Sequence, residues 1–169
     1  MSTRSLIGIK RDGNITSIYC HFDGYLEGVG ETLVNHYDTE EKIDALLEHG
    51  DMSCLGEDIK SCEFYKDRGE DDVDAQTLYE KDNREGDSVE NRYYISGQHC
   101  WADYVYLFKD GKWYYAFECV DNEKMKGLTI SFTKETKESP ILYLPPVWKL
   151  VTDGIAEIEL KRKQKQNNG

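Results

Sequence analysis

Two Asp-Gly steps constrain the fold of this chain more than any other feature. Asp12-Gly13 and Asp110-Gly111 each lie between runs of residues that are typical of β-strands. Both residues of an Asp-Gly step adopt the positive φ of a tight hairpin turn at little cost, so the sequence predicts two β-hairpins. The four strands expected from these turns are residues 4–10, 15–22, 100–108 and 112–120.

Two short helices are expected after the first hairpin, at residues 31–37 and 40–49. Thr39 is a favourable N-cap with two glutamates in the following turn, and Gly50 is placed to end the second helix. The apolar residues recur at helical spacing, which predicts that the helices pack through one stripe. Its members are Leu33, Val34, Ile43, Leu46 and Leu47.

Shorter β-rich runs predict further strands, which places the chain in the α+β class. We expect a mainly antiparallel β-sheet with the pair of short helices on one face. The Ile141–Leu144 run ends at Pro145-Pro146, because proline donates no hydrogen bond to a strand ladder. The additional runs are residues 61–66, 92–95, 128–133, 141–144 and 155–160.

The predicted domain organisation is one α+β domain at residues 1–160, followed by a basic, disordered tail at 161–169. The domain contains a segment at about 67–91 with ten acidic residues against Arg68, Lys81 and Arg84, and with little apolar periodicity. We therefore interpret 67–91 as a loop with at most one or two helical turns.

Charge and apolar patterning exclude several classes of protein. Asp and Glu outnumber Lys and Arg by 33 to 21, a net charge of −12, which disfavours direct binding to nucleic acid or to an anionic membrane. The sequence has no apolar run long enough to span a bilayer and no signal-peptide pattern, so we expect a cytoplasmic protein. The five cysteines form no CxxC pair and are expected to be reduced.

The turn at the end of the second strand carries a candidate ligand site. His21 and Asp23 are two residues apart and can share one face of a strand, and Tyr25 and Arg68 are further candidate contacts. The simpler interpretation is an Asp23-Gly24 turn with His21 hydrogen-bonded in place, so neither a metal nor a cofactor is expected. An N-terminal-nucleophile hydrolase acting through Ser2 is disfavoured because Met1 would block the amine.

Aromatic residues alternate along the second predicted hairpin. One face of these strands is expected to be core, and the other to expose tyrosines of the kind found at protein interfaces. The residues are Trp101, Tyr104, Tyr106, Trp113, Tyr114, Tyr115 and Phe117.

A family resemblance covers about residues 2–71. The segments STRSLIGIK, ITSIYCHFDGYLEGVGETLVNHY, EEKIDALLEHGDMSCLG and FYKDRGED resemble a group of small bacteriophage and prophage proteins, with a weaker echo in VYLFKDGKWYY. Leu26 replaces the proline that usually follows the DGY step in that group. The resemblance implies an origin in a mobile element and action in the cytoplasm of an infected bacterium.

Charge and resemblance together predict a binding protein rather than an enzyme. Residues 38–90 hold 19 acidic and 6 basic side chains, a net −13, and such a field steers a protein onto a basic surface. By analogy with anti-CRISPR-type phage inhibitors, we expect it to occupy the basic nucleic-acid-binding surface of a host defence protein. The alternatives are an aromatic pocket that sequesters a nucleotide signal, and a minor phage accessory enzyme. The candidate partner-binding residues are Glu63, Asp67, Glu70, Asp71, Asp72, Asp74, Asp82, Glu85 and Asp87.

Overall fold

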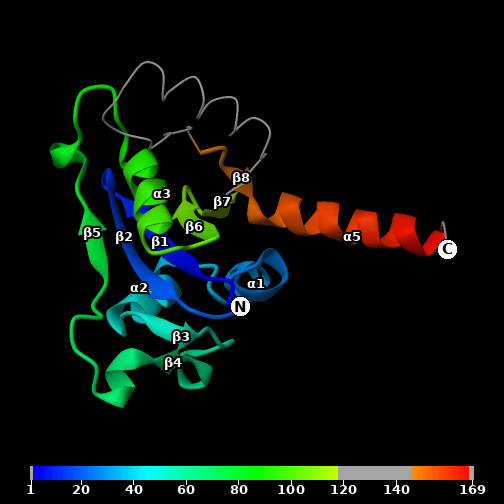
Figure 1. Ribbon diagram of the computed structural model, residues 1–169, viewed down its shortest axis with the longest axis horizontal. Coiled ribbons are helices and arrows are strands. Elements are labelled where there is room, and N and C mark those ends of the chain that lie inside the picture. The colour runs from blue at the N-terminus through cyan, green and yellow to red at the C-terminus, as the bar shows by residue number, and fades with distance from the viewer. Residues whose placement is uncertain (1, 118–145, 168–169) are drawn as a thin grey trace, which may run out of the picture.

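The computed structural model describes residues 2–117 and 146–167, whose centre is an eight-stranded sheet (Figure 1). Hydrogen-bonded neighbours follow the order β4-β3-β2-β1-β6-β7-β8, and β3 and β5 pair with opposite ends of β2. The strands are β1 (Ser5–Arg11), β2 (Asn14–Cys20), β3 (Met52–Cys54), β4 (Glu63–Phe64), β5 (Gln76–Leu78), β6 (Tyr104–Lys109), β7 (Lys112–Phe117) and β8 (Lys149–Leu150).

The two predicted Asp-Gly hairpins are confirmed and form the middle of this sheet. Asp12 and Gly13 have φ of +53° and +80°, and Asp110 and Gly111 have +52° and +76°, as the tight turn requires. The hairpins β1–β2 and β6–β7 are joined by parallel pairing of β1 with β6. The β2–β3 pairing is also parallel and the others are antiparallel, so the α+β class with a mainly antiparallel sheet is confirmed.

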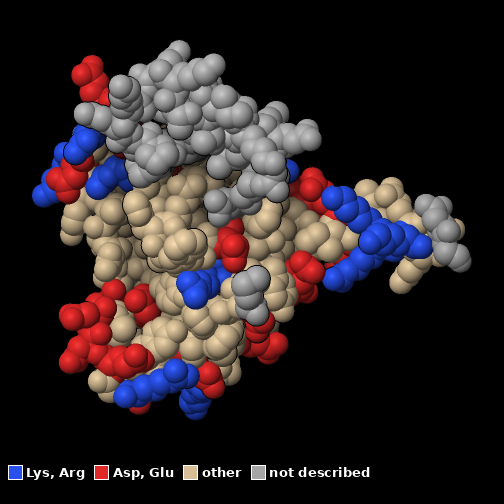
Figure 2. Space-filling model, viewed as in Figure 1, with Lys and Arg blue, Asp and Glu red and all other residues tan. Residues whose placement is uncertain are grey.

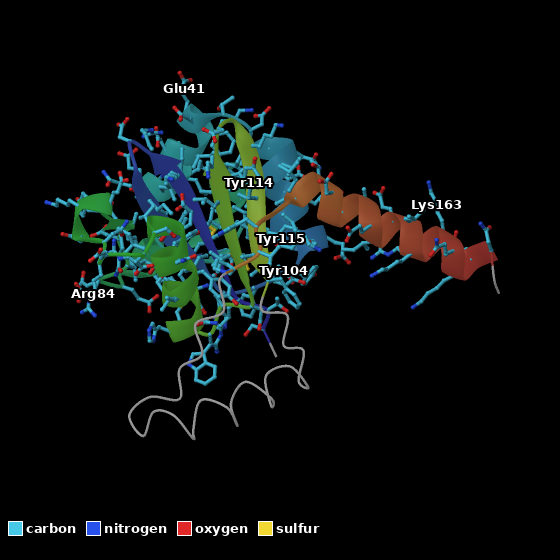
Figure 3. The ribbon with its side chains drawn as sticks, turned by 90° about the horizontal axis from the view of Figure 1, so that it is seen from above. Glu41, Arg84, Tyr104, Tyr114, Tyr115 and Lys163 are labelled. Atoms are coloured by element: carbon cyan, nitrogen blue, oxygen red, sulfur yellow. The ribbon has the colours of Figure 1, made fainter. Side chains whose placement is uncertain are left out.

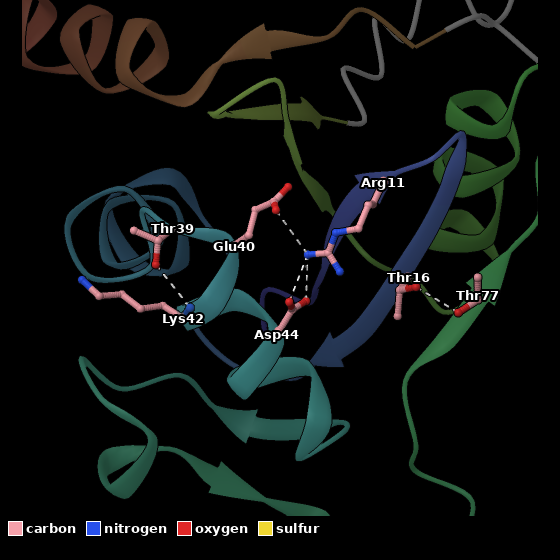
Figure 4. Close-up of polar contacts among 7 residues, drawn as sticks. All are labelled: Arg11, Thr16, Thr39, Glu40, Lys42, Asp44 and Thr77. Atoms are coloured by element: carbon pink, nitrogen blue, oxygen red, sulfur yellow. Dashed lines mark hydrogen bonds and ion pairs between the residues drawn. The ribbon is translucent and has the colours of Figure 1, made fainter.

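The predicted helix pair covers one face of the sheet. A π-helical turn, η1 (Leu26–Gly30), leads into α1 (Glu31–His36), and α2 (Glu40–Glu48) follows. Thr39 caps α2 by accepting a hydrogen bond from the Lys42 N–H, and Arg11 donates to both Asp44 oxygens at 3.0 Å, which ties α2 to β1 (Figure 4). The predicted apolar stripe packs here, with Val34 half-buried and the others buried: Leu33, Ile43, Leu46 and Leu47.

A third helix, α3 (Val89–His99), covers the opposite face and corrects two predictions. Residues 92–95 are helical rather than a strand, and helices cover both faces of the sheet rather than one. Ser88 caps the helix, and Val89, Tyr93 and Gly97 are buried at a four-residue spacing. Helix and sheet approach closely at Gly97, where a Cβ would lie 2.6 Å from a methyl carbon of Val105.

The C-terminal predictions are wrong. Residues 155–160, expected as a strand, and residues 161–167, expected as a disordered tail, belong to one helix, α5 (Val151–Asn167). The buried Val151 and Gly154 and the partly buried Ile155 and Ile158 follow the spacing of a helix face, which a strand would not bury together. Beyond these residues α5 extends away from the sheet (Figure 1).

The acidic segment 67–91 is more structured than predicted. It contains part of the 3₁₀ turn η3 (Tyr65–Arg68), strand β5, the turn η4 (Glu80–Asp82) and the start of α3. Strand β5 adds to the edge of β2, and the Thr16 and Thr77 hydroxyls are 2.9 Å apart across that pairing (Figure 4).

The remaining expectations concern strand ends and residues outside the described ranges. Residues 100–103 are not part of β6, because they form the turn that ends α3, and the run at 61–66 reduces to β4. The runs expected at 128–133 and 141–144, the end of the second hairpin beyond Phe117, and Cys119 lie outside the described residues.

Candidate functional site

All nine candidate partner-binding carboxylates are exposed, but they form two groups rather than one surface. Strand β5 separates the groups, and in Figure 2 acidic side chains gather over β4 and the segment that leads into β5, at the lower left. We call that first group the acidic surface: Glu63, Asp67, Glu70, Asp71, Asp72 and Asp74. The second group, between β5 and α3, is Asp82, Glu85 and Asp87.

The backbone of the acidic surface is fixed by two hydrogen bonds to Asp51, between α2 and β3. The Tyr65 N–H donates to the Asp51 carbonyl at 3.2 Å, and the Asp51 N–H donates to the Val73 carbonyl at 2.7 Å. Gly50, at φ +81°, permits this approach, since a Cβ there would lie 2.3 Å from the Val73 oxygen. The intervening residues are therefore held at both ends.

Most carboxylates of the acidic surface have no cationic partner among the residues that the structure describes. Lys66 pairs with Asp74, and Arg68 lies 3.6 Å from Glu63. Within the described part of the chain, the other members form no ion pair: Asp67, Glu70, Asp71 and Asp72. This arrangement concentrates negative charge that remains available to a basic partner.

The second acidic group lies beside a structural contact. Asp87 accepts the Ser88 N–H at 2.8 Å, next to the N-cap of α3, and Arg92 donates to Asn83 and to the Tyr79 carbonyl at 2.7 Å. These bonds connect the segment to α3. The acidic surface is therefore the stronger candidate for partner binding.

The candidate ligand residues of the turn after β2 are not brought together as one cluster. The Tyr25 hydroxyl donates to Asp23 at 3.2 Å, and the Asp23 carboxylate raises the pKa of Tyr25. Arg68 instead donates to the Ser53 hydroxyl at 3.1 Å and lies over the Tyr65 ring.

His21 belongs to a hydrogen-bonded chain with Tyr19 and Ser2. Its Nδ1 lies 2.7 Å from the Tyr19 hydroxyl, and its Nε2 lies 3.1 Å from the Ser2 hydroxyl. Burial raises the pKa of Tyr19 to about 12, against the effect of the nearby Arg4 charge, so the phenol is neutral at pH 7. These two hydrogen bonds fix His21, as the simpler interpretation of this turn expects. They also fix Ser2, which the sequence pattern did not indicate.

The aromatic hairpin has a core face as predicted, because Tyr106, Trp113 and Tyr115 are buried and Tyr104 stacks on Tyr106 with ring centres 6.1 Å apart. The expectation that the other face exposes tyrosines is wrong. Val105 and Leu107 are buried there against α3, and Tyr114 is half-buried (Figure 3).

Trp101 departs from the aromatic-hairpin prediction, because it lies in the turn after α3 and is 77% exposed. It lines a surface pocket of about 670 Å³ together with Ser2, Thr3, Arg4 and Asp103.

The cysteines in the described part of the chain form no disulfide bond. Cys20, Cys54, Cys62 and Cys100 are all free. Burial raises the pKa of Cys20 to about 12, so its sulfur is a thiol rather than the thiolate that nucleophilic attack and metal binding require.

Among residues 2–117 and 146–167, no helix combines the length and apolar character needed to cross a membrane. No protein-family model, curated protein or solved structure matches this chain.

Proposed function

We propose that this protein is a bacteriophage-encoded inhibitor that occupies the basic surface of a host nucleic-acid-directed defence protein. The acidic surface is the part of the molecule that makes this contact, in the cytoplasm of the infected bacterium. The observation that carries the proposal is the set of four exposed carboxylates without ion-pair partners in the described structure, on a backbone held at both ends. A surface fixed before binding loses less conformational entropy when its partner docks.

The distribution of charge supports one orientation of approach. The basic end of α5, which includes Lys163, lies on the opposite side of the molecule from Arg84 and the segments that flank β5 (Figure 3). A basic partner is attracted to the acidic side and repelled by α5. Such steering acts mainly on the association rate and weakens with added salt.

The proposal is tested by direct binding to purified bacterial defence proteins that bind DNA, including a CRISPR effector. We expect at least one of them to bind this protein in competition with its own DNA. The association rate should fall steeply between about 0.1 M and 1 M salt, where the screening length shortens from about 10 to 3 Å.

Two variants with equal charge change identify the surface. One carries Glu70→Gln, Asp71→Asn and Asp72→Asn, and the matched control carries Asp82→Asn, Glu85→Gln and Asp87→Asn. The first should lose at least about tenfold in association rate while the control stays near the parent. Neither variant should melt appreciably lower than the parent, because all six residues are exposed. Equal binding by both variants, or no DNA-competitive binding at all, contradicts the proposal.

A further inference from the structure

Trp101 occupies a backbone position that normally belongs to glycine. Helix α3 ends with the Trp101 N–H donating to the Gln98 carbonyl and the Ala102 N–H donating to the Gly97 carbonyl. This is the Schellman arrangement, whose left-handed residue is usually Gly because a side chain is strained there. Trp101 has φ +63° and nevertheless carries the largest of all side chains.

The side chain of the strained Trp101 does not pack against the described residues. Trp101 is 77% exposed and makes no ring contact or side-chain hydrogen bond with the described residues. A bulky residue held in a strained conformation and directed into solvent is typical of a position that clamps a ligand. The ring therefore presents a flat apolar surface for stacking.

The pocket beside Trp101 contains the cation Arg4, which pairs with no carboxylate among residues 2–117 and 146–167. Arg4 lines the pocket and forms no ion pair with any described residue, although its charge is close enough to act on Tyr19. A guanidinium presents donors in a fork that matches a phosphate.

Hydroxyl and carboxylate groups complete the lining of the pocket. The Ser2 hydroxyl lies 3.1 Å from Nε2 of His21, whose Nδ1 lies 2.7 Å from the Tyr19 hydroxyl, so these hydrogen bonds hold Ser2 in place. Asp103 adds a carboxylate, and Thr3 a second hydroxyl, at the same pocket.

We propose that this pocket binds a nucleoside monophosphate. The base stacks on Trp101, Arg4 pairs with the phosphate, and Asp103 accepts hydrogen bonds from the sugar hydroxyls or from an amino group of the base. The volume of about 670 Å³ lies within the range of small-ligand sites. A free nucleotide is favoured over a polynucleotide because a molecule of net charge −12 repels a chain of phosphates.

This site is separate from the acidic surface and does not depend on the proposed inhibitor function. Its residues come from the segment that leads into β1 and from the turn after α3, whereas the acidic surface comes from β4 and the segment that leads into β5.

The test is isothermal titration calorimetry with AMP, GMP, CMP and UMP, and with the four corresponding nucleosides and inorganic phosphate as partial ligands. We expect saturable binding of at least one nucleotide, with quenching of tryptophan fluorescence. For the nucleotide that binds, Arg4→Gln should weaken affinity at least tenfold. The affinity for the corresponding nucleoside, which lacks the phosphate, should not change with Arg4→Gln.

Trp101→Gly separates loss of the site from loss of the fold. Glycine suits the left-handed position, so this variant should keep or raise the melting temperature while nucleotide binding is lost. The matched controls remove an exposed aromatic and an exposed cation elsewhere, Tyr79→Ala and Arg84→Gln, and should bind like the parent.

Three outcomes overturn the proposal. They are the absence of saturable binding by all four nucleotides, unchanged binding in both Trp101→Gly and Arg4→Gln, and binding of inorganic phosphate as tightly as the nucleotide.

Discussion

Glu90 is placed where a single carboxylate connects helix α3 to the central strands. Lys10 of β1 pairs with it directly, and the Lys109 ammonium lies 4.0 Å away, while the Glu90 side chain is only 18% exposed. Burial alone would raise the pKa of Glu90, but the Lys10 hydrogen bond and the two positive charges lower it below the ordinary value. The ionised form is therefore favoured by folding.

Glu90→Gln should lower the free energy of unfolding by about 1 kcal/mol at pH 7, the range of a partly solvated charged hydrogen bond. Because the folded pKa lies below the unfolded value of about 4.3, this contribution is present above that pH and is lost as the pH falls. Urea unfolding of parent and variant at about pH 7 and 3.5 measures it. Asp44→Asn, at an exposed ion pair, is the control and should change stability less. A Glu90→Gln effect of equal size at both pH values would rule out this account.

Among the elements, the two hairpins and the α1–α2 pair could be predicted from local turn, cap and apolar-stripe signals, whereas α3 and α5 were not. Both Asp-Gly hairpins and the Thr39 cap form from neighbours in the sequence. Residues 92–95 contain aromatic and β-branched side chains, and their local propensity favoured a strand. The buried spacing of Val89, Tyr93 and Gly97, together with the Ser88 cap, was the signal for a helix.

Helix α5 divides into an anchored half and a half that no other element covers. Val151 is fully buried, whereas residues 161–167 are all exposed and contact the body through the Arg162–Glu27 pair at 3.1 Å. Deleting residues 161–169 should therefore change the free energy of unfolding by less than about 1 kcal/mol. Val151→Ala should cost about 2 kcal/mol, the value of the apolar burial that it removes. Urea unfolding of the two variants measures both changes. Equal losses in the free energy of unfolding would show that the C-terminal half of α5 is an integral part of the fold.

At the scale of the whole molecule, the sequence predicted the features of the candidate sites that local sequence decides, but not those that depend on the fold. Charge along the chain indicated the acidic surface, because exposed carboxylates need no particular fold to be exposed. The sequence did not indicate that β5 separates two acidic groups, that Arg68 donates to Ser53, or that Arg4 and Trp101 share a pocket. These placements depend on strand pairing and on where α3 ends, which are non-local properties.

The excess negative charge of the molecule should make its stability rise with salt. The net charge of −12 repels itself in the folded state, and screening shortens the range of that repulsion from about 30 Å at 0.01 M salt to about 8 Å at 0.15 M. We expect the melting temperature to rise over this interval by about 2–4 °C for each kcal/mol of repulsion removed.

The variant with Glu70→Gln, Asp71→Asn and Asp72→Asn should melt higher than the parent at low salt and respond less to added salt, because it lacks three of the repelling charges. Thermal unfolding followed by circular dichroism at the two salt concentrations measures both effects. A melting temperature that falls as salt is added would mean that the attractive pairs, such as Lys10 with Glu90 and Arg11 with Asp44, outweigh the repulsion. In that case the unpaired carboxylates of the acidic surface would not set the salt response of the fold, and the substitution of three of them should leave that response unchanged.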